Sequence, residues 1–124
     1  MTRTGRAGAR RALVIEDDVD VRHLLRSYLS RLGWAVEECG TGEHGLEAAR
    51  RTPPDLVVLD LMLPGISGHE VLAALRSDPA MPGVTVVVSS VLDRHDQLAL
   101  PADAVLPKPF SRADLQAVLT RIGS

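Results

Sequence analysis

Residues 55–68 read DLVVLDLMLPGISG and carry the strongest structural signal in the chain. Residues 56–59 are apolar at every position, and such a run without alternation is typical of a parallel strand that is covered on both faces. Asp60 ends this run with a carboxylate. Ser67, with Glu70 three residues later, matches a capping box that opens a helix. The stretch therefore predicts a buried strand, a loop and a helix over about residues 68–77.

The same alternation of strand and helix extends along the whole chain. Four further runs of mainly apolar residues predict strands at residues 12–15, 34–36, 84–88 and 105–106. The segment 34–36 ends in Glu37 and Glu38, so we expect it at an edge of the sheet. Amphipathic patterns predict further helices over residues 21–32, 42–51, 91–100 and 111–122, of which 91–100 is the shortest and ends before Pro101. This order implies a parallel α/β sheet with helices on both faces.

Composition limits the class of protein. The 124 residues are 45% hydrophobic and 24% charged, which suits one globular domain. No run approaches the ~18 apolar residues of a membrane span. Cys39 is the single cysteine, which excludes an internal disulfide framework and a multi-cysteine zinc site and fits a reducing cytoplasm.

Charge is unevenly distributed along the chain. The first 11 residues contain four arginines and no acid, and we expect residues 1–9 to form a disordered basic leader before a domain over residues 10–124. The other 113 residues hold ten basic and sixteen acidic side chains, a formal charge of −6. A nucleic-acid-binding body would carry a basic face, so we expect no direct nucleic-acid binding by this domain.

Polar side chains follow the predicted strands at their carboxyl ends. Glu16 and Asp17 follow the first strand, Asp60 the third and Ser89 the fourth, and Lys108, the only lysine, follows the fifth. The carboxyl ends of parallel strands share one edge of a sheet, where open α/β sheets bind ligands. Clustered carboxylates repel one another, and a divalent cation with oxygen ligands relieves that repulsion. We therefore predict a magnesium site at this edge.

Four stretches together resemble the receiver domain of bacterial two-component response regulators, at residues 12–18, 55–68, 86–90 and 108–110. The resemblance covers about residues 10–122. It implies a flavodoxin-like (βα)5 fold, a three-layer sandwich with a parallel sheet of order 2-1-3-4-5 and a shortened fourth helix.

The resemblance also implies a role for each site residue. Asp60 resembles the aspartate that accepts a phosphoryl group, Ser89 the hydroxyl that moves toward that group, and Lys108 the lysine that contacts it. The implied metal ligands for Mg²⁺ are Glu16, Asp17, Asp60 and the main-chain carbonyl of Met62. Receivers usually have a cis peptide before the proline that follows this lysine, so we expect Lys108–Pro109 to be cis.

The function implied is a magnesium-dependent phosphoprotein of a two-component system in the cytoplasm. It would take a phosphoryl group from a sensor histidine kinase or a histidine phosphotransfer protein and would signal to an unknown downstream protein partner through a changed binding surface. We expect no enzyme activity beyond self-phosphotransfer and autodephosphorylation, no membrane contact, and a monomer or a phosphorylation-dependent dimer. The chain is either a single-domain regulator or a piece of a longer protein.

Two departures from the family keep an alternative open. Val105 stands where receivers usually have an aromatic residue, and Lys108 follows Ser89 by only 19 positions, which shortens the fourth helix. Both favour a pseudo-receiver that binds protein without phosphorylation. A flavin- or nucleotide-binding α/β protein is a more distant alternative, and the glycine pattern GTGEHG at residues 40–45 is better explained as a helix-entry loop. A hydrolase triad built on Ser89 or Ser90 with His95 lacks a nucleophile elbow.

Overall fold

The computed structural model describes residues 10–91 and 100–123, which contain five strands and four helices. The predicted leader, residues 1–9, and most of the predicted helix 91–100 lie outside the described residues. The elements are β1 (Arg11–Ile15), α1 (Val19–Arg31), β2 (Ala35–Cys39), α2 (Gly42–Arg51), β3 (Leu56–Asp60), α3 (Gly68–Ser77), β4 (Thr85–Ser90), β5 (Ala104–Pro107) and α5 (Arg112–Arg121).

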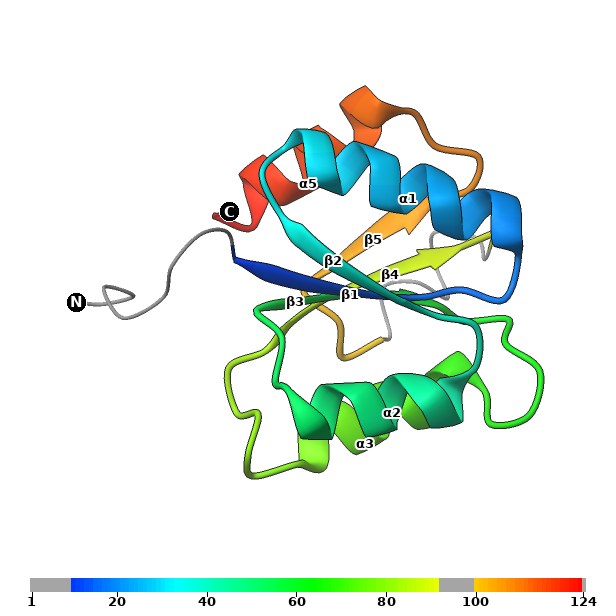
Figure 1. Cartoon of the computed structure of the whole chain (residues 1–124), viewed down its shortest axis with the longest axis vertical. Helices are drawn as coiled ribbons and strands as arrows, with labels where there is room; N and C mark the ends of the chain where they lie inside the picture. The colour runs from blue at the N-terminus through cyan, green and yellow to red at the C-terminus, as the bar shows by residue number, and fades with distance from the viewer. Residues whose placement is uncertain (1–9, 92–99, 124) are drawn as a thin grey trace.

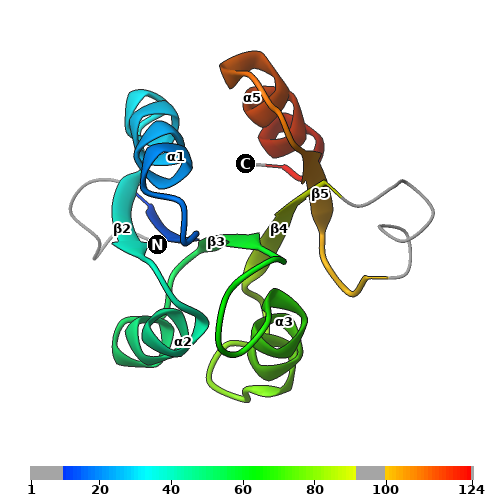
Figure 2. The same cartoon turned by 90° about the vertical axis from the view of Figure 1, so that its right-hand side faces the viewer.

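The five strands form one parallel sheet in the order β2-β1-β3-β4-β5. Helices α1 and α5 cover one face of this sheet, and α2 and α3 cover the other, so the molecule has three layers (Figures 1 and 2). The predicted flavodoxin-like fold and strand order are therefore confirmed.

Successive residues of the central strands point into two separate cores. Leu13 and Ile15 of β1 pack with buried residues of α2 and α3, whereas Ala12 and Val14 pack with buried residues of α1 and α5. All five residues of β3 are buried, as a strand covered on both faces requires. The uninterrupted apolar runs therefore provide core residues on both faces of the sheet.

The edge position predicted for the second strand is confirmed, but its predicted limits are wrong. Trp34 precedes the strand and packs in the core beneath α1 and α5, and β2 continues to Cys39. Glu37 and Glu38 therefore lie inside the strand. An edge strand tolerates them because arginines of neighbouring elements pair with their carboxylates.

Capping residues decide where the helices begin. Asp18 accepts hydrogen bonds from the main-chain N–H groups at the start of α1, and Thr41 does the same for α2. Ser67 and Glu70 form the predicted capping box, and Ser111 opens α5 in the same way. None of the described helices is both long and apolar enough to cross a membrane.

An arginine of α3 holds the start of β5, the strand that leads to Lys108. Arg76 donates hydrogen bonds to the main-chain carbonyls of Pro101 and Val84, each at 2.8 Å, and pairs with Asp103 at 2.7 Å. The carboxylate of Asp103 also accepts a hydrogen bond from the main-chain N–H of Val86. These contacts tie β5 to β4 and α3, so the strand enters the sheet in a defined register.

Candidate functional site

The polar residues that follow the strands meet at one edge of the sheet, as predicted. Asp60, the last residue of β3, is paired in register with Ser89 of β4, which in turn is paired with Leu106 of β5. Glu16 directly follows β1, the other neighbour of β3. The main-chain N–H of Lys108 donates to the carbonyl of Ser90 at 3.0 Å, which keeps Lys108 beside the end of β4.

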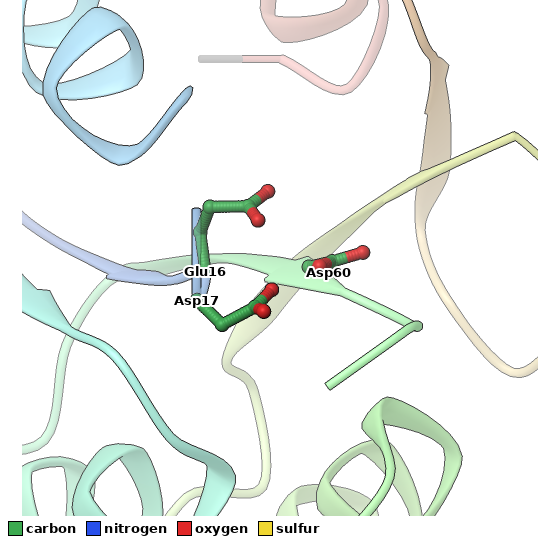
Figure 3. A group of neighbouring side chains, drawn as sticks. All are labelled: Glu16, Asp17 and Asp60. Carbon is green, nitrogen blue, oxygen red and sulfur yellow. The ribbon is translucent and has the colours of Figure 1, made fainter. Parts of the chain in front are cut away.

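Three carboxylates form the centre of the site. Glu16, Asp17 and Asp60 each offer an oxygen atom, and these oxygens lie within 4.8 Å of one another (Figure 3). Glu16 is 1% exposed and Asp60 3% exposed, whereas Asp17 is open to solvent. Glu16 and Asp60 are therefore shielded from solvent, whereas the carboxylate of Asp17 is directly accessible to a hydrated ion.

Lys108 provides the positive charge nearest to this group. Its Nζ atom lies 2.9 Å from Oε1 of Glu16 and 3.4 Å from Oδ1 of Asp60. The Lys108–Pro109 peptide bond is cis, as predicted. Burial disfavours the ammonium, but the hydrogen bonds and charges of Glu16 and Asp60 outweigh it and raise the pKa of Lys108 above its ordinary value.

One lysine does not balance three carboxylates. Burial raises the pKa of Glu16 to about 7, and the negative charge of Asp60 adds to this, although Lys108 and the main-chain N–H of Asp18 stabilise the carboxylate. A divalent cation would relieve this excess negative charge. The available donors are hard oxygen atoms without sulfur or imidazole, which suits Mg²⁺. The residues present therefore fit the predicted metal.

Two further predicted residues complete the surroundings of Asp60. The main-chain N–H of Met62 donates to Oδ1 of Asp60 at 3.1 Å, while the side chain of Met62 is exposed. Ser89 is fully buried next to Asp60 in the sheet, and within the described residues its Oγ has no hydrogen-bond partner. A buried hydroxyl without a partner is uncommon and leaves one donor available at the site.

Two residues that shape this edge were not predicted from the sequence. Arg22 of α1 donates a hydrogen bond to the main-chain carbonyl of Glu16 at 3.0 Å. Gly68 leaves no room for a side chain, because a Cβ there would overlap the main-chain oxygen of Asp60 and the Cα of Leu61. The sequence offered one indication of a specific role for Arg22: it is a basic residue near the amino end of a predicted helix, where the helix dipole disfavours a positive charge.

Within the described residues, the structure gives no support to the nucleotide-binding or hydrolase alternatives, and it gives two glycines of residues 40–45 a packing role. A Cβ at Gly42 would strike Ile66 and Val71, and one at Gly45 would strike Ile15, so these glycines let α2 pack closely on the sheet and on α3. His95 of the considered triad lies outside the described residues. Among the residues that the structure describes, no histidine belongs to the group able to hold a metal.

Comparisons with known proteins identify a family and a shared fold. Residues 12–120 match the family model of the response regulator receiver domain. The chain is 46% identical over 111 residues to the transcriptional activator protein PfeR of Pseudomonas aeruginosa, covering 86% of this chain and 35% of that protein. It is 38% identical over 117 residues to the probable transcriptional regulatory protein TcrX of Mycobacterium tuberculosis, covering 90% and 50%. The chain thus spans half or less of the length of these relatives.

Solved structures share the fold. The chemotaxis response regulator CheY4 of Vibrio cholerae superposes with a TM-score of 0.85 at 22% identity, covering 92% of this chain and 98% of that one. The receiver domain of the sensor histidine kinase PA1611 of Pseudomonas aeruginosa superposes with a TM-score of 0.84 at 26% identity, covering 94% and 99%. That structure holds a magnesium ion coordinated in its active site cleft.

Proposed function

Because this chain belongs to the response regulator receiver family of two-component systems, we propose that Asp60 is its phosphoryl acceptor. The donor would be a phosphohistidine of a sensor histidine kinase or of a histidine phosphotransfer protein. The observation that carries the proposal is the position of the buried Asp60 carboxylate, which lies beside two further carboxylates and 3.4 Å from the ammonium of Lys108. A carboxylate with a metal-binding pair on one side and a cation on the other is suited to phosphoryl transfer.

The ligands proposed for Mg²⁺ are Glu16, Asp17, Asp60 and the main-chain carbonyl of Met62. When bound, Mg²⁺ would neutralise charge on the phosphoryl oxygens and on Asp60. Asp17 is the exposed member of the group and would exchange its water for the ion most readily. Glu16 is buried and held by Lys108 and by the N–H of Asp18, so its carboxylate keeps a constant orientation.

The transfer itself needs a nucleophile and charge stabilisation. An oxygen of the Asp60 carboxylate would attack phosphorus, the P–N bond to the donor imidazole would break, and the nitrogen would leave with the bonding pair. The product is an acyl phosphate on Asp60. Lys108 and Ser89 would donate hydrogen bonds to the phosphoryl oxygens, which carry the charge in the transition state.

Ser89 also offers a route from the phosphoryl group to a changed binding surface. Its hydroxyl has no partner within the described residues, so a phosphoryl oxygen would supply the acceptor it lacks. Movement of Ser89 would displace β5, because Ser89 is paired with Leu106 of that strand. We propose that this movement alters recognition by a downstream protein partner, that the cycle closes by autodephosphorylation, and that the protein acts in the cytoplasm.

One observation favours a second candidate. Val105 of β5 occupies the position at which receivers usually have an aromatic residue, and a valine cannot swing a ring between buried and exposed positions. A pseudo-receiver that binds its partner without phosphorylation would tolerate this. The complete set of carboxylates, Ser89 and Lys108 favours the phosphorylated receiver.

Labelling with acetyl phosphate tests the proposal. After borohydride trapping, mass spectrometry should place one adduct on residue 60, and Asp60→Asn should lose it. Asp18→Asn is the matched control, because asparagine also caps helices and Asp18 is outside the acidic group. Labelling of Asp60→Asn at the wild-type level would refute the assignment. An unlabelled wild-type protein that binds Mg²⁺ would favour the pseudo-receiver.

A further inference from the structure

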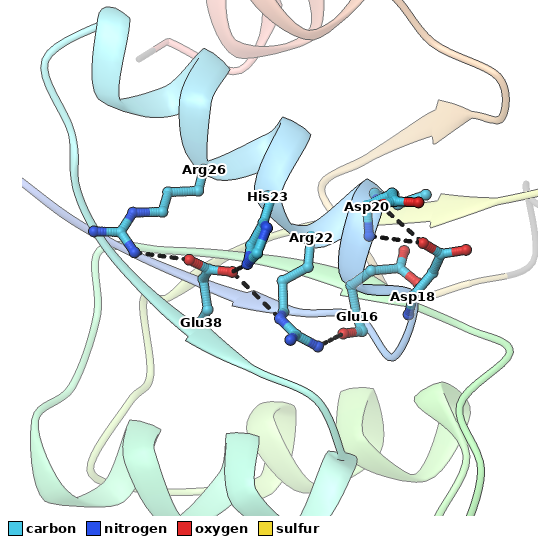
Figure 4. Close-up of polar contacts among 8 residues, drawn as sticks. Glu16, Asp18, Asp20, Arg22, His23, Arg26 and Glu38 are labelled. Atoms are coloured by element: carbon cyan, nitrogen blue, oxygen red, sulfur yellow. Dashed lines mark hydrogen bonds and ion pairs between the residues drawn. The ribbon is translucent and has the colours of Figure 1, made fainter.

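Arg22 connects the acidic site to the edge strand of the sheet. Its guanidinium donates from Nη1 to the main-chain carbonyl of Glu16 at 3.0 Å and from Nε to Oε1 of Glu38 at 3.3 Å (Figure 4). Glu38 belongs to β2, and Arg22 lies near the amino end of α1. One side chain therefore joins a helix, the edge strand and the loop that carries the acidic pair.

The position of Arg22 is electrostatically unfavourable for the helix itself. The amino end of a helix carries partial positive charge and disfavours a cation. The side chain of Arg22 is 19% exposed and that of Glu38 13% exposed, so their contact is largely withdrawn from solvent. Two specific hydrogen bonds compensate for this placement, and one of them reaches the metal-binding loop.

The carbonyl that Arg22 contacts belongs to the peptide group between Glu16 and Asp17. The preceding peptide group is also held, because the N–H of Glu16 donates to the carbonyl of Cys39 at 3.0 Å. Gly40 leaves space for the guanidinium, since a Cβ there would lie 3.1 Å from Nη1 of Arg22. These two peptide groups flank Glu16 and fix the direction in which its side chain leaves the main chain. The second of them also precedes Asp17, whose following peptide group is held by the hydrogen bond from the N–H of Asp18 to Oε2 of Glu16.

We propose that Arg22, oriented by Glu38, is a positioning residue of the metal site. It holds the peptide between Glu16 and Asp17 in the conformation that brings both carboxylates to Asp60, and it thereby strengthens Mg²⁺ binding. This inference rests on the proposed magnesium site. Arg22 does not touch the ion; it acts through the main chain of its ligands.

The positive charge of Arg22 and its positioning role predict opposite changes in Mg²⁺ affinity when Arg22 is replaced, so the two explanations can be distinguished. If Arg22 acted only through its positive charge, then Arg22→Gln would remove a repulsion and tighten Mg²⁺ binding. If it positions the ligands, the same variant should bind Mg²⁺ about threefold to tenfold more weakly, the range expected for one hydrogen bond. Arg22→Lys keeps the charge but not the two-pronged geometry, and it should also bind more weakly.

The experiment is calorimetric titration of MgCl₂ into the metal-free protein, with circular dichroism to verify that each variant is folded. Arg26→Gln is the matched control. Arg26 pairs with the same Glu38 at 2.9 Å but is 59% exposed and, in the described part of the chain, forms no hydrogen bond or ion pair with Glu16. Its loss should leave the Mg²⁺ dissociation constant within twofold of wild type. Labelling of Arg22→Gln by acetyl phosphate should be slow at low Mg²⁺ and should return to the wild-type rate at saturating Mg²⁺.

Unchanged or tighter Mg²⁺ binding in the folded Arg22 variants would overturn the inference while leaving the magnesium site intact. Equal weakening in Arg26→Gln would also overturn it, because the effect would then come from Glu38 alone. If the wild-type protein bound no Mg²⁺, the proposed magnesium site would fail, and the positioning role would fail with it.

Discussion

Replacing Gly68 with alanine should damage both the stability of the fold and the site. Gly68 is the first residue of α3, and its main-chain N–H donates to the carbonyl of Leu61 at 3.1 Å. A Cβ at this position would approach the main-chain oxygen of Asp60 and the Cα of Leu61 more closely than 3.0 Å, which Cβ atoms essentially never do. Both obstacles are main-chain atoms, so no side-chain rotation relieves the overlap.

The overlap at Gly68 sets the expected loss in the free energy of unfolding. Overpacking of this kind costs typically about 1–3 kcal/mol. Loss of the hydrogen bond to Leu61 adds about 0.5–1.5 kcal/mol. Alanine recovers about 0.4–1 kcal/mol by restricting the unfolded chain. We therefore expect Gly68→Ala to lower the free energy of unfolding by about 2–3 kcal/mol and Tm by roughly 10 °C. Displacement of Asp60 should weaken Mg²⁺ binding as well.

Urea denaturation followed by circular dichroism measures the stability change, with Gly83→Ala as the control. A Cβ at Gly83 would meet no atom within 4 Å, and this glycine has no positive φ, so alanine should be neutral there or stabilise the protein slightly. A Gly68→Ala protein within about 0.5 kcal/mol of the Gly83→Ala protein would refute the packing argument, because surface substitutions without a structural role fall in that range.

Two further predictions concern the charged and polar groups of the site. Ser89→Ala should raise the stability of the unphosphorylated protein by about 1 kcal/mol in urea denaturation, because it removes a buried hydroxyl that has no partner within the described residues; lower stability would show that the hydroxyl is satisfied. In EDTA, the protein should lose stability as pH rises from about 4.5 to about 7. Burial raises the pKa of Glu16 from 4.5 to about 7, so in this window the folded state keeps a proton that the unfolded chain has released. Glu16→Gln should lack this loss in thermal unfolding across the pH range, and a wild-type profile without it would contradict the raised pKa.

The order of elements, the sheet edge and the identity of the gathered residues follow from the sequence alone. The apolar run that ends in Asp60 and the capping box at Ser67 and Glu70 are local patterns, and both are confirmed. The residues at the carboxyl ends of parallel strands must meet, so the approach of Glu16 and Lys108 to Asp60 followed from topology.

Contacts between distant residues required the tertiary structure. The second strand runs through Glu37 and Glu38 because arginines of other elements pair with them, which a local reading of polarity does not capture. The hydrogen bond from Arg22 to the carbonyl of Glu16 depends on how α1 docks beside β2. The missing space at Gly68 depends on how α3 approaches β3.

Features that the sequence predicts and features that only the tertiary structure shows depend on interactions of different range. Hydrophobic periodicity and helix capping act between residues a few positions apart, so the chain displays them before it folds. The pKa of Glu16 and the unpartnered hydroxyl of Ser89 arise from burial and from neighbours brought together only by packing. The sequence by itself therefore determined which groups gather at the edge of the sheet, and only the tertiary structure decided how they are oriented, charged and held, because those properties depend on ångström-scale distances between elements.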